Sequence, residues 1–251
     1  MSSANYLRTF IRWLLLFVDP RKLISWIYLP RYIKHWRQYQ SQVDERLRIK
    51  DSYPCLADWV SSTPFDPHYF YQGAWLSRRI AEAKPELHVD VGSSVLTVGV
   101  MSAQVLTVFV DYRPLNAQLP NLLNVGGSIV SLPFATASID SLSCLHVLEH
   151  IGLGRYGDPI DPAGSEKALH ELKRVLAPRG RLYLSVPVGR ERVCFNAHRV
   201  FDPQTIIITL SDFNLLEFGL VDDSGVYKES AFPEAACHLE YGCGLFVFEK
   251  P

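Results

Sequence analysis

Helical and extended patterns of apolar residues alternate along the chain from residue 75 onwards. This alternation is typical of an α/β fold in which helices cover both faces of a parallel sheet. We therefore expect a seven-stranded, mostly parallel sheet flanked by helices, with the last two strands antiparallel. The expected strands are 87–91, 105–111, a segment near 126–131, 139–146, 181–187, 215–223 and 244–250.

Three helices are expected, one before the first of these strands and two between later ones. The segment 74–83 has a helical pattern and is stopped by Pro85. Within 164–178 the apolar residues recur at helical spacing, and Pro178 closes the element. The third expected helix is 203–213.

The first 52 residues form a basic, aromatic helical extension, and residues 53–251 form the α/β domain. Within residues 1–40, Arg and Lys side chains are interleaved with aromatic residues and accompanied by one acid, Asp19. The apolar stretch 13–18 is shorter than the roughly 20 residues that a membrane-spanning helix needs. Two interpretations stay open: peripheral contact with an anionic membrane surface, or packing on the main domain or on a second subunit.

Whole-chain composition indicates a globular protein without a nucleic-acid partner. The 25 Lys and Arg residues nearly balance 26 Asp and Glu residues, so the basic excess typical of nucleic-acid binding is missing. The five cysteines form no CxxC pair, and no secretory signal is evident. We expect a cytoplasmic protein without disulfides or structural zinc, membrane-peripheral contact being the open alternative. The oligomeric state stays undetermined.

The loop after the first expected strand is where a nucleotide-like cofactor would lie, because small residues let backbone amides approach it closely. Asp90, Gly92, Ser93 and Ser94 are its small or polar positions. The second and third glycines of a GxGxxG motif are missing, which disfavours a nicotinamide dehydrogenase. Asp111 ends the next strand, about 20 residues later, where a carboxylate can bind both ribose hydroxyls.

Two later segments carry a family resemblance. SLPFATASIDSLSCLHVLEHI (131–151) and ALHELKRVLAPRGRLYLSVP (168–187) closely resemble the middle of class I S-adenosylmethionine-dependent methyltransferases. HVLEHIGLGRYGDPIDPAG and VPVGRERVCFNAHRVFDP are similar to the family known as domain of unknown function 268, and this likeness covers most of the α/β domain. The resemblance implies a Rossmann-like fold, S-adenosylmethionine as the cofactor and a glycan-biosynthesis context.

The resemblance also implies cofactor contacts. In the methyltransferases the acid of strand two holds the ribose, and the segment before LPF contacts adenine. Ser94 stands in the place of a loop glycine, and Ser128 stands where an adenine-binding acid is common. Losing such a carboxylate removes a contact worth about 1.5–3 kcal/mol. The expected cofactor-binding residues are Asp90, Gly92, Ser93, Ser94, Asp111, Tyr112, Ser128, Leu132 and His146.

Methyl transfer to a hydroxyl needs an aligned nucleophile and a base that takes its proton. His146, at the end of the fourth strand, and His198 are the candidate bases, because imidazole titrates near neutrality. Alternatively, His146 caps the following helix and His198 belongs to a polar lock. Glu149 and His150 are adjacent and interpreted as structural, so no metal site is expected.

Substrate contacts are expected from the glycine-containing loop 152–162 and from the region after the fifth strand. The segment 68–75 could cover the cofactor from the other side with Tyr71 and Gln72, although core packing is the favoured interpretation of these side chains. The expected substrate-binding residues are Arg155, Tyr156, Asp158 and Arg199.

Taken with the resemblance, these residues predict an S-adenosylmethionine-dependent methyltransferase that acts on an oxygen of a sugar or glycan-linked acceptor. The alternative is a non-catalytic scaffold or binding protein with a methyltransferase fold at the membrane surface. The basic, aromatic extension and the degenerate loop after the first strand motivate this alternative.

Overall fold

The computed structural model describes residues 24–251. The chain divides into two compact units, residues 1–64 and 65–251, a boundary later than the one expected after residue 52. Expectations about side chains before residue 24 lie outside the described residues. Within the described range, no helix combines the length and apolar character that crossing a membrane requires.

Within residues 24–64 of the first unit, helix α3 (Leu29–Gln40) packs against the segment that follows it. Arg31 donates a hydrogen bond to the carbonyl of Leu56 at 2.8 Å. The hydroxyl groups of Tyr32 and Ser52 lie 2.6 Å apart. The elements of this unit are η1 (Trp26–Tyr28), α3 (Leu29–Gln40) and η2 (Ile49–Asp51).

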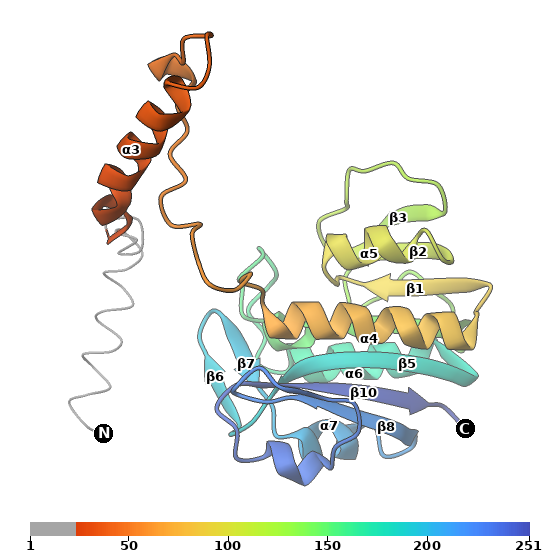
Figure 1. Ribbon diagram of the computed structural model, residues 1–251. Helices are drawn as coiled ribbons and strands as arrows, with labels where there is room; N and C mark the ends of the chain where they lie inside the picture. The colour runs from red at the N-terminus through yellow and green to blue at the C-terminus, as the bar shows by residue number, and fades with distance from the viewer. Residues whose placement is uncertain (1–23) are drawn as a thin grey trace. The chain divides into compact units, whose positions relative to one another are not determined.

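The second unit is built on an eight-stranded sheet with the order β3-β2-β1-β4-β5-β10-β8-β9. The first five strands in this order run parallel, and the last three are antiparallel to their neighbours. Figure 1 shows α4 lying along one face of this sheet. The strands are β1 (Leu87–Val91), β2 (Leu106–Asp111), β3 (Leu122–Gly126), β4 (Ile139–Leu145), β5 (Leu176–Val188), β8 (Asn214–Val221), β9 (Tyr227–Lys228) and β10 (Gly242–Glu249).

Helices cover both faces of the sheet. Side chains along a strand alternate between its two sides, and the strands carry apolar side chains on both, which the helices bury. In β5, Leu182 and Leu184 belong to the apolar cluster that includes α6 and α7, whereas Tyr183 belongs to the cluster that includes α4. The side chain of Asp66 caps α4 by accepting from two backbone amides of its first turn. The helical elements are α4 (Pro67–Ala83), α5 (Val95–Met101), η3 (Leu148–His150), α6 (Gly164–Val175), α7 (Pro203–Thr209) and η4 (Pro233–Ala236).

The α/β class and the mostly parallel sheet are confirmed, but several elements differ from expectation. The third strand is 122–126, because residues 126–131 fold into a turn closed by a bridge between Ser128 and Ser131. The short β9 adds an eighth strand. A helix begins at Val95, inside the stretch expected to be a loop. A hairpin of β6 (Arg192–Cys194) and β7 (His198–Val200) precedes α7.

Candidate functional site

A cavity of about 330 Å³ opens at the carboxyl ends of β1, β2 and β4. From β1 the chain adds β2 and β3 on one side of the sheet and then continues with β4 and β5 on the other side of β1, so the strand order reverses at β1. Such a reversal of strand order is where open α/β sheets bind ligands. The cavity volume lies at the lower end of the roughly 300–1,000 Å³ of small-molecule sites. The geometry therefore favours a small-molecule site here.

The turn after β1 forms one wall of the cavity and depends on Gly92. This residue has a φ of +70°, a conformation that glycine adopts without strain. A Cβ at Gly92 would lie 3.1 Å from Val147 and 3.7 Å from the Oδ2 atom of Asp111. Ser93 and Ser94 complete this wall. The missing side chain thus keeps the space beside Asp111 open.

Asp111 presents a free carboxylate oxygen at the end of β2. Its Oδ1 atom accepts a hydrogen bond from the backbone amide of Arg113 at 2.6 Å. Its Oδ2 atom accepts no hydrogen bond from any residue in 24–251 and lies beside Gly92. Tyr112, the next residue, also lines the cavity. Asp111 can therefore accept hydrogen bonds from a ligand, as the sequence predicts.

Asp90 was expected to bind the cofactor, but it lies beneath the turn and outside the cavity lining. It is 2% exposed, accepts a hydrogen bond from the amide of Ser93 at 3.0 Å, and accepts a second one from Ser143. The Ser143 hydroxyl also lies 2.8 Å from the buried ring of His88. Asp90 therefore ties the turn to β4 and positions the residues that do line the cavity.

The buried carboxyl of Asp90 predicts a pH-dependent stability. Burial raises the pKa of Asp90 from 3.8 to about 6, although hydrogen bonds from Ser143 and Ser93 oppose the shift. The folded state thus holds this proton more tightly than the unfolded state. The resulting stability is complete below pH 3.8 and is lost as the pH rises through about 6.

We expect Asp90→Asn to remove this loss. Its free energy of unfolding, relative to the unsubstituted protein, should rise by roughly 2–3 kcal/mol between about pH 4 and neutral pH. Urea denaturation across this range measures the difference. The exposed Asp140 on β4 supplies the control, and Asp140→Asn should show no such rise. A difference for Asp90→Asn that stays constant with pH would contradict the assignment.

His146 lines the cavity, but both of its ring nitrogens are engaged within the protein. Nδ1 lies 3.1 Å from Oε1 of Glu149, and Nε2 lies 3.3 Å from Sγ of Cys243. Burial alone would lower the pKa of His146, but Cys243 and Glu149 outweigh that effect and raise it. His146 has a φ of +53°. In this geometry it is not placed to take a proton from a ligand.

His150 is the second histidine that lines the cavity. From the sequence we interpreted it as a structural residue. Its Nδ1 atom lies 2.7 Å from the carbonyl of Ala197, so Nδ1 carries the proton and Nε2 has a free lone pair. Burial lowers the pKa of His150, although Glu149 opposes the shift. The carboxylate of Glu149 lies 3.6 Å from Nε2. The lowered pKa favours the neutral form of the His150 ring, which can accept a proton at Nε2.

Tyr156 and Asp158, both predicted substrate residues, line the cavity. The guanidinium groups of Arg113 and Arg155 lie 4.4 Å and 5.1 Å from the centre of the Tyr156 ring. Cation–π contacts of this kind hold the loop 152–162 against the loop after β2. Arg155 itself donates to the carbonyl of Ala197 at 2.9 Å and is not part of the lining.

The other predicted residues lie away from the main cavity. Ser128 lines an adjoining cavity of about 150 Å³. Leu132 is buried in the core. Arg199 donates to the carbonyl of Ile151 at 2.6 Å and so braces the glycine-containing loop. The ring of His198 packs 4.9 Å from that of Tyr241.

Sequence reasoning missed Tyr69 and Arg113, which also line the cavity. Tyr69 lies in the segment 68–75, for which core packing of Tyr71 and Gln72 was the favoured interpretation and covering of the cofactor the alternative. Tyr71 instead stacks on a neighbouring tyrosine, and Gln72 is buried under β5, where it accepts from Ser185. Counting helical turns from the Asp66 cap would have separated these faces.

Comparison with known proteins adds a family and a fold. Residues 94–224 match the family described as "Caenorhabditis protein of unknown function, DUF268". N-methyltransferase NodS from Bradyrhizobium japonicum, solved with S-adenosyl-L-homocysteine, is 14% identical with a TM-score of 0.50, over 73% of this chain and 88% of that one. A candidate methyltransferase from Bacillus halodurans, BH2331, is 16% identical with a TM-score of 0.51, over 71% and 98% of the two chains. At these identities the similarity establishes the fold. No curated protein matches significantly.

Proposed function

Because this chain belongs to the DUF268 family and has the Rossmann-like fold of S-adenosylmethionine-dependent methyltransferases, we propose that it transfers a methyl group from S-adenosylmethionine. The observation that carries the proposal is the free Oδ2 atom of Asp111 beside Gly92, at the reversal of strand order. An acid in this place can bind both hydroxyls of a ribose. S-adenosylmethionine would supply an electrophilic methyl group.

The residues around the cavity fit this cofactor. Because Gly92 has no side chain, the protein backbone of this turn can approach a ligand closely. Asp111 can accept hydrogen bonds from the ribose hydroxyls. Val110 and Ile129 offer apolar surface to a flat ring. Ser128, in the adjoining cavity, would contribute a neutral hydrogen bond where an acid is common.

We assign the role of general base to His150 rather than to His146 or His198. His150 lines the cavity, burial favours its neutral form, and the contact of Nδ1 with the carbonyl of Ala197 leaves Nε2 as the nitrogen that can take a proton. When it takes a proton from an acceptor hydroxyl, the carboxylate of Glu149 stabilises the imidazolium that forms, because opposite charges attract strongly in a buried site. His146 would form the wall behind the reacting atoms.

We propose a hydroxyl group of a sugar or glycan-linked molecule as the methyl acceptor. The support is the side-chain set at the cavity mouth: Tyr69 offers an aromatic ring, and the carboxylate of Asp158, which already accepts from the amides of Gly152 and Tyr156, can accept further hydrogen bonds. The test is incubation with methyl-labelled S-adenosylmethionine and separate glycolipid, oligosaccharide, protein and nucleic-acid fractions of a cell extract. Label in a glycan fraction supports the proposal, and label confined to protein or nucleic acid would contradict the acceptor class.

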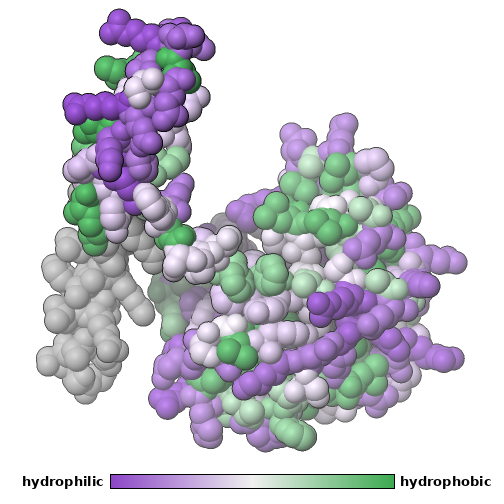
Figure 2. Space-filling view, in the orientation of Figure 1, coloured by the Kyte–Doolittle hydropathy of each residue, from purple (hydrophilic) through white to green (hydrophobic). Residues whose placement is uncertain are grey.

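A second candidate function rests on the first unit of the chain. Trp26 and Ile27 are 63% and 65% exposed, and α3 carries Arg31, Lys34 and Arg37. Figure 2 shows hydrophobic and hydrophilic residues next to one another on the surface of this unit. This mixture suits a non-catalytic role at an anionic membrane surface.

Vesicle flotation tests this second candidate. The full chain should float with vesicles that contain phosphatidylserine and stay behind with phosphatidylcholine alone, because the attraction is electrostatic. Removal of residues 1–52 should abolish flotation. Equal recovery of the full and shortened chains would rule out this role for the extension.

A further inference from the structure

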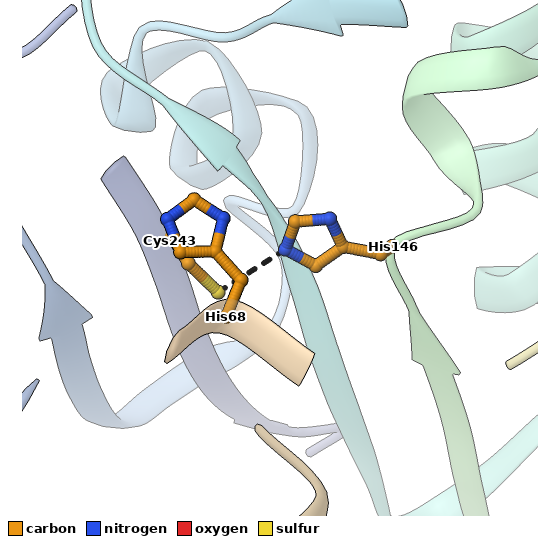
Figure 3. A group of neighbouring side chains, drawn as sticks. All are labelled: His68, His146 and Cys243. Carbon is orange, nitrogen blue, oxygen red and sulfur yellow. Dashed lines mark hydrogen bonds between the residues drawn. The ribbon is translucent and has the colours of Figure 1, made fainter. Parts of the chain in front are cut away.

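Three side chains with metal-binding atoms converge beside the cavity. His68 lies in the first turn of α4, His146 directly follows β4, and Cys243 is the second residue of β10. Their donor atoms all lie within 4.8 Å of one another. Figure 3 shows the ring of His146 directed at the Cys243 sulfur, with Nε2 and Sγ 3.3 Å apart. These three residues form no metal-binding sequence motif, because they are far apart in the sequence.

The cluster is largely buried, and His68 has no polar partner within it. His68, His146 and Cys243 are 9%, 6% and 0% exposed. Within the part of the chain that the structure describes, the imidazole of His68 forms no hydrogen bond or ion pair. Its contacts are with the rings of His146, 5.4 Å away, and Tyr241, 5.2 Å away. His68 also lines a cavity together with Asp66, Asp222 and Tyr241, so a ligand can reach its ring from that side.

The carboxylate of Glu149 is placed to orient His146 toward a bound metal. Its Oε1 atom lies 3.1 Å from Nδ1 of His146, and its buried Oε2 atom has no partner among residues 24–251. Metal-bound histidines commonly donate their second N–H to a carboxylate in this way, which directs the other nitrogen at the metal. A Cys243 thiolate and the Glu149 carboxylate would together carry the two negative charges that balance a divalent cation.

We propose that His68, His146 and Cys243 bind a divalent transition metal, with Glu149 orienting His146. Imidazole and thiolate donors favour Zn²⁺. Zinc bond lengths of roughly 2.0–2.3 Å place tetrahedral ligand atoms about 3.5 Å apart. The Nε2–Sγ pair already meets this spacing, and the widest separation in the cluster must shorten by roughly 1 Å. Three protein ligands leave the fourth position to water or to an atom of a substrate.

This metal site does not depend on the proposed methyl transfer, and metal content tests it directly. The full chain, expressed with added zinc and dialysed, should retain about one zinc ion per chain by elemental analysis. After the zinc is removed, Co²⁺ should produce a thiolate-to-cobalt charge-transfer band in the near ultraviolet. Cys243→Ser should abolish this band, and Glu149→Gln should weaken cobalt binding by about 10–100-fold.

Cys194→Ser is the matched control, because Cys194 is a partly exposed thiol on β6, outside the cluster. It should bind cobalt like the unsubstituted protein. Circular dichroism checks that each variant folds, and His68→Gln replaces Cys243→Ser in the test if the latter does not. A full chain that holds no zinc and gives no thiolate band, or a folded Cys243→Ser or His68→Gln variant that binds cobalt with unchanged affinity, would overturn the proposal.

Discussion

Asp111→Ala is expected to lower the affinity for S-adenosylmethionine by at least about 100-fold. Two hydrogen bonds from ribose hydroxyls to a carboxylate contribute about 1.5–3 kcal/mol each, and each 1.4 kcal/mol changes an affinity by about tenfold. The side chain is 20% exposed and makes one hydrogen bond of its own, to the amide of Arg113. Its removal should therefore leave the fold intact. Equilibrium dialysis with labelled cofactor measures the change.

Asp140→Ala is the control for this substitution. Asp140 is an exposed acid at the amino end of β4, at the opposite edge of the sheet from the cavity, and its replacement should leave the affinity unchanged. Equal affinities for Asp111→Ala and Asp140→Ala would mean that the cofactor does not lie against Asp111.

His150→Asn is expected to lower the rate of methyl transfer by about 10²–10⁴-fold, the usual contribution of a general base. The asparagine amide can still donate to the carbonyl of Ala197, as Nδ1 of His150 does, while the base nitrogen is lost. Cofactor affinity should stay unchanged. Single-turnover transfer to the labelled acceptor fraction measures the rate.

His170→Asn is the matched control, because His170 is exposed on α6 and pairs with Glu166. Its rate should equal that of the unsubstituted protein. The pH profile gives a second check: because burial lowers the pKa of His150, transfer should stay fast down to below the usual histidine pKa and fall only at more acidic pH. A His150→Asn variant with a normal rate would remove His150 from the mechanism.

The elements nearest the site were predictable because their signals are local. β1 coincides with the expected segment 87–91, and β4 ends one residue before the expected 139–146. β1 alternates apolar and polar residues, and β4 alternates at first and ends in an apolar stretch, which are the local signals of strands. Asp111 follows from the same logic, since an acid that ends a parallel strand must lie at the ligand-binding edge of the sheet.

Contacts between distant segments could not be predicted in this way. The position of Asp90 beneath the turn depends on Ser143, a partner on the neighbouring strand. The approach of His68 to Cys243 depends on how α4 packs over β10. The third strand was misplaced because Ile129 has the apolar, β-branched character of a strand residue, yet it packs into the core from a turn.

Calorimetric titration of the full chain with S-adenosylhomocysteine tests the central claim most directly, since this product shares the adenosine that Asp111 would bind and needs no acceptor. We expect saturable binding of one molecule per chain, lost in Asp111→Ala. The absence of saturable binding at millimolar ligand would contradict it.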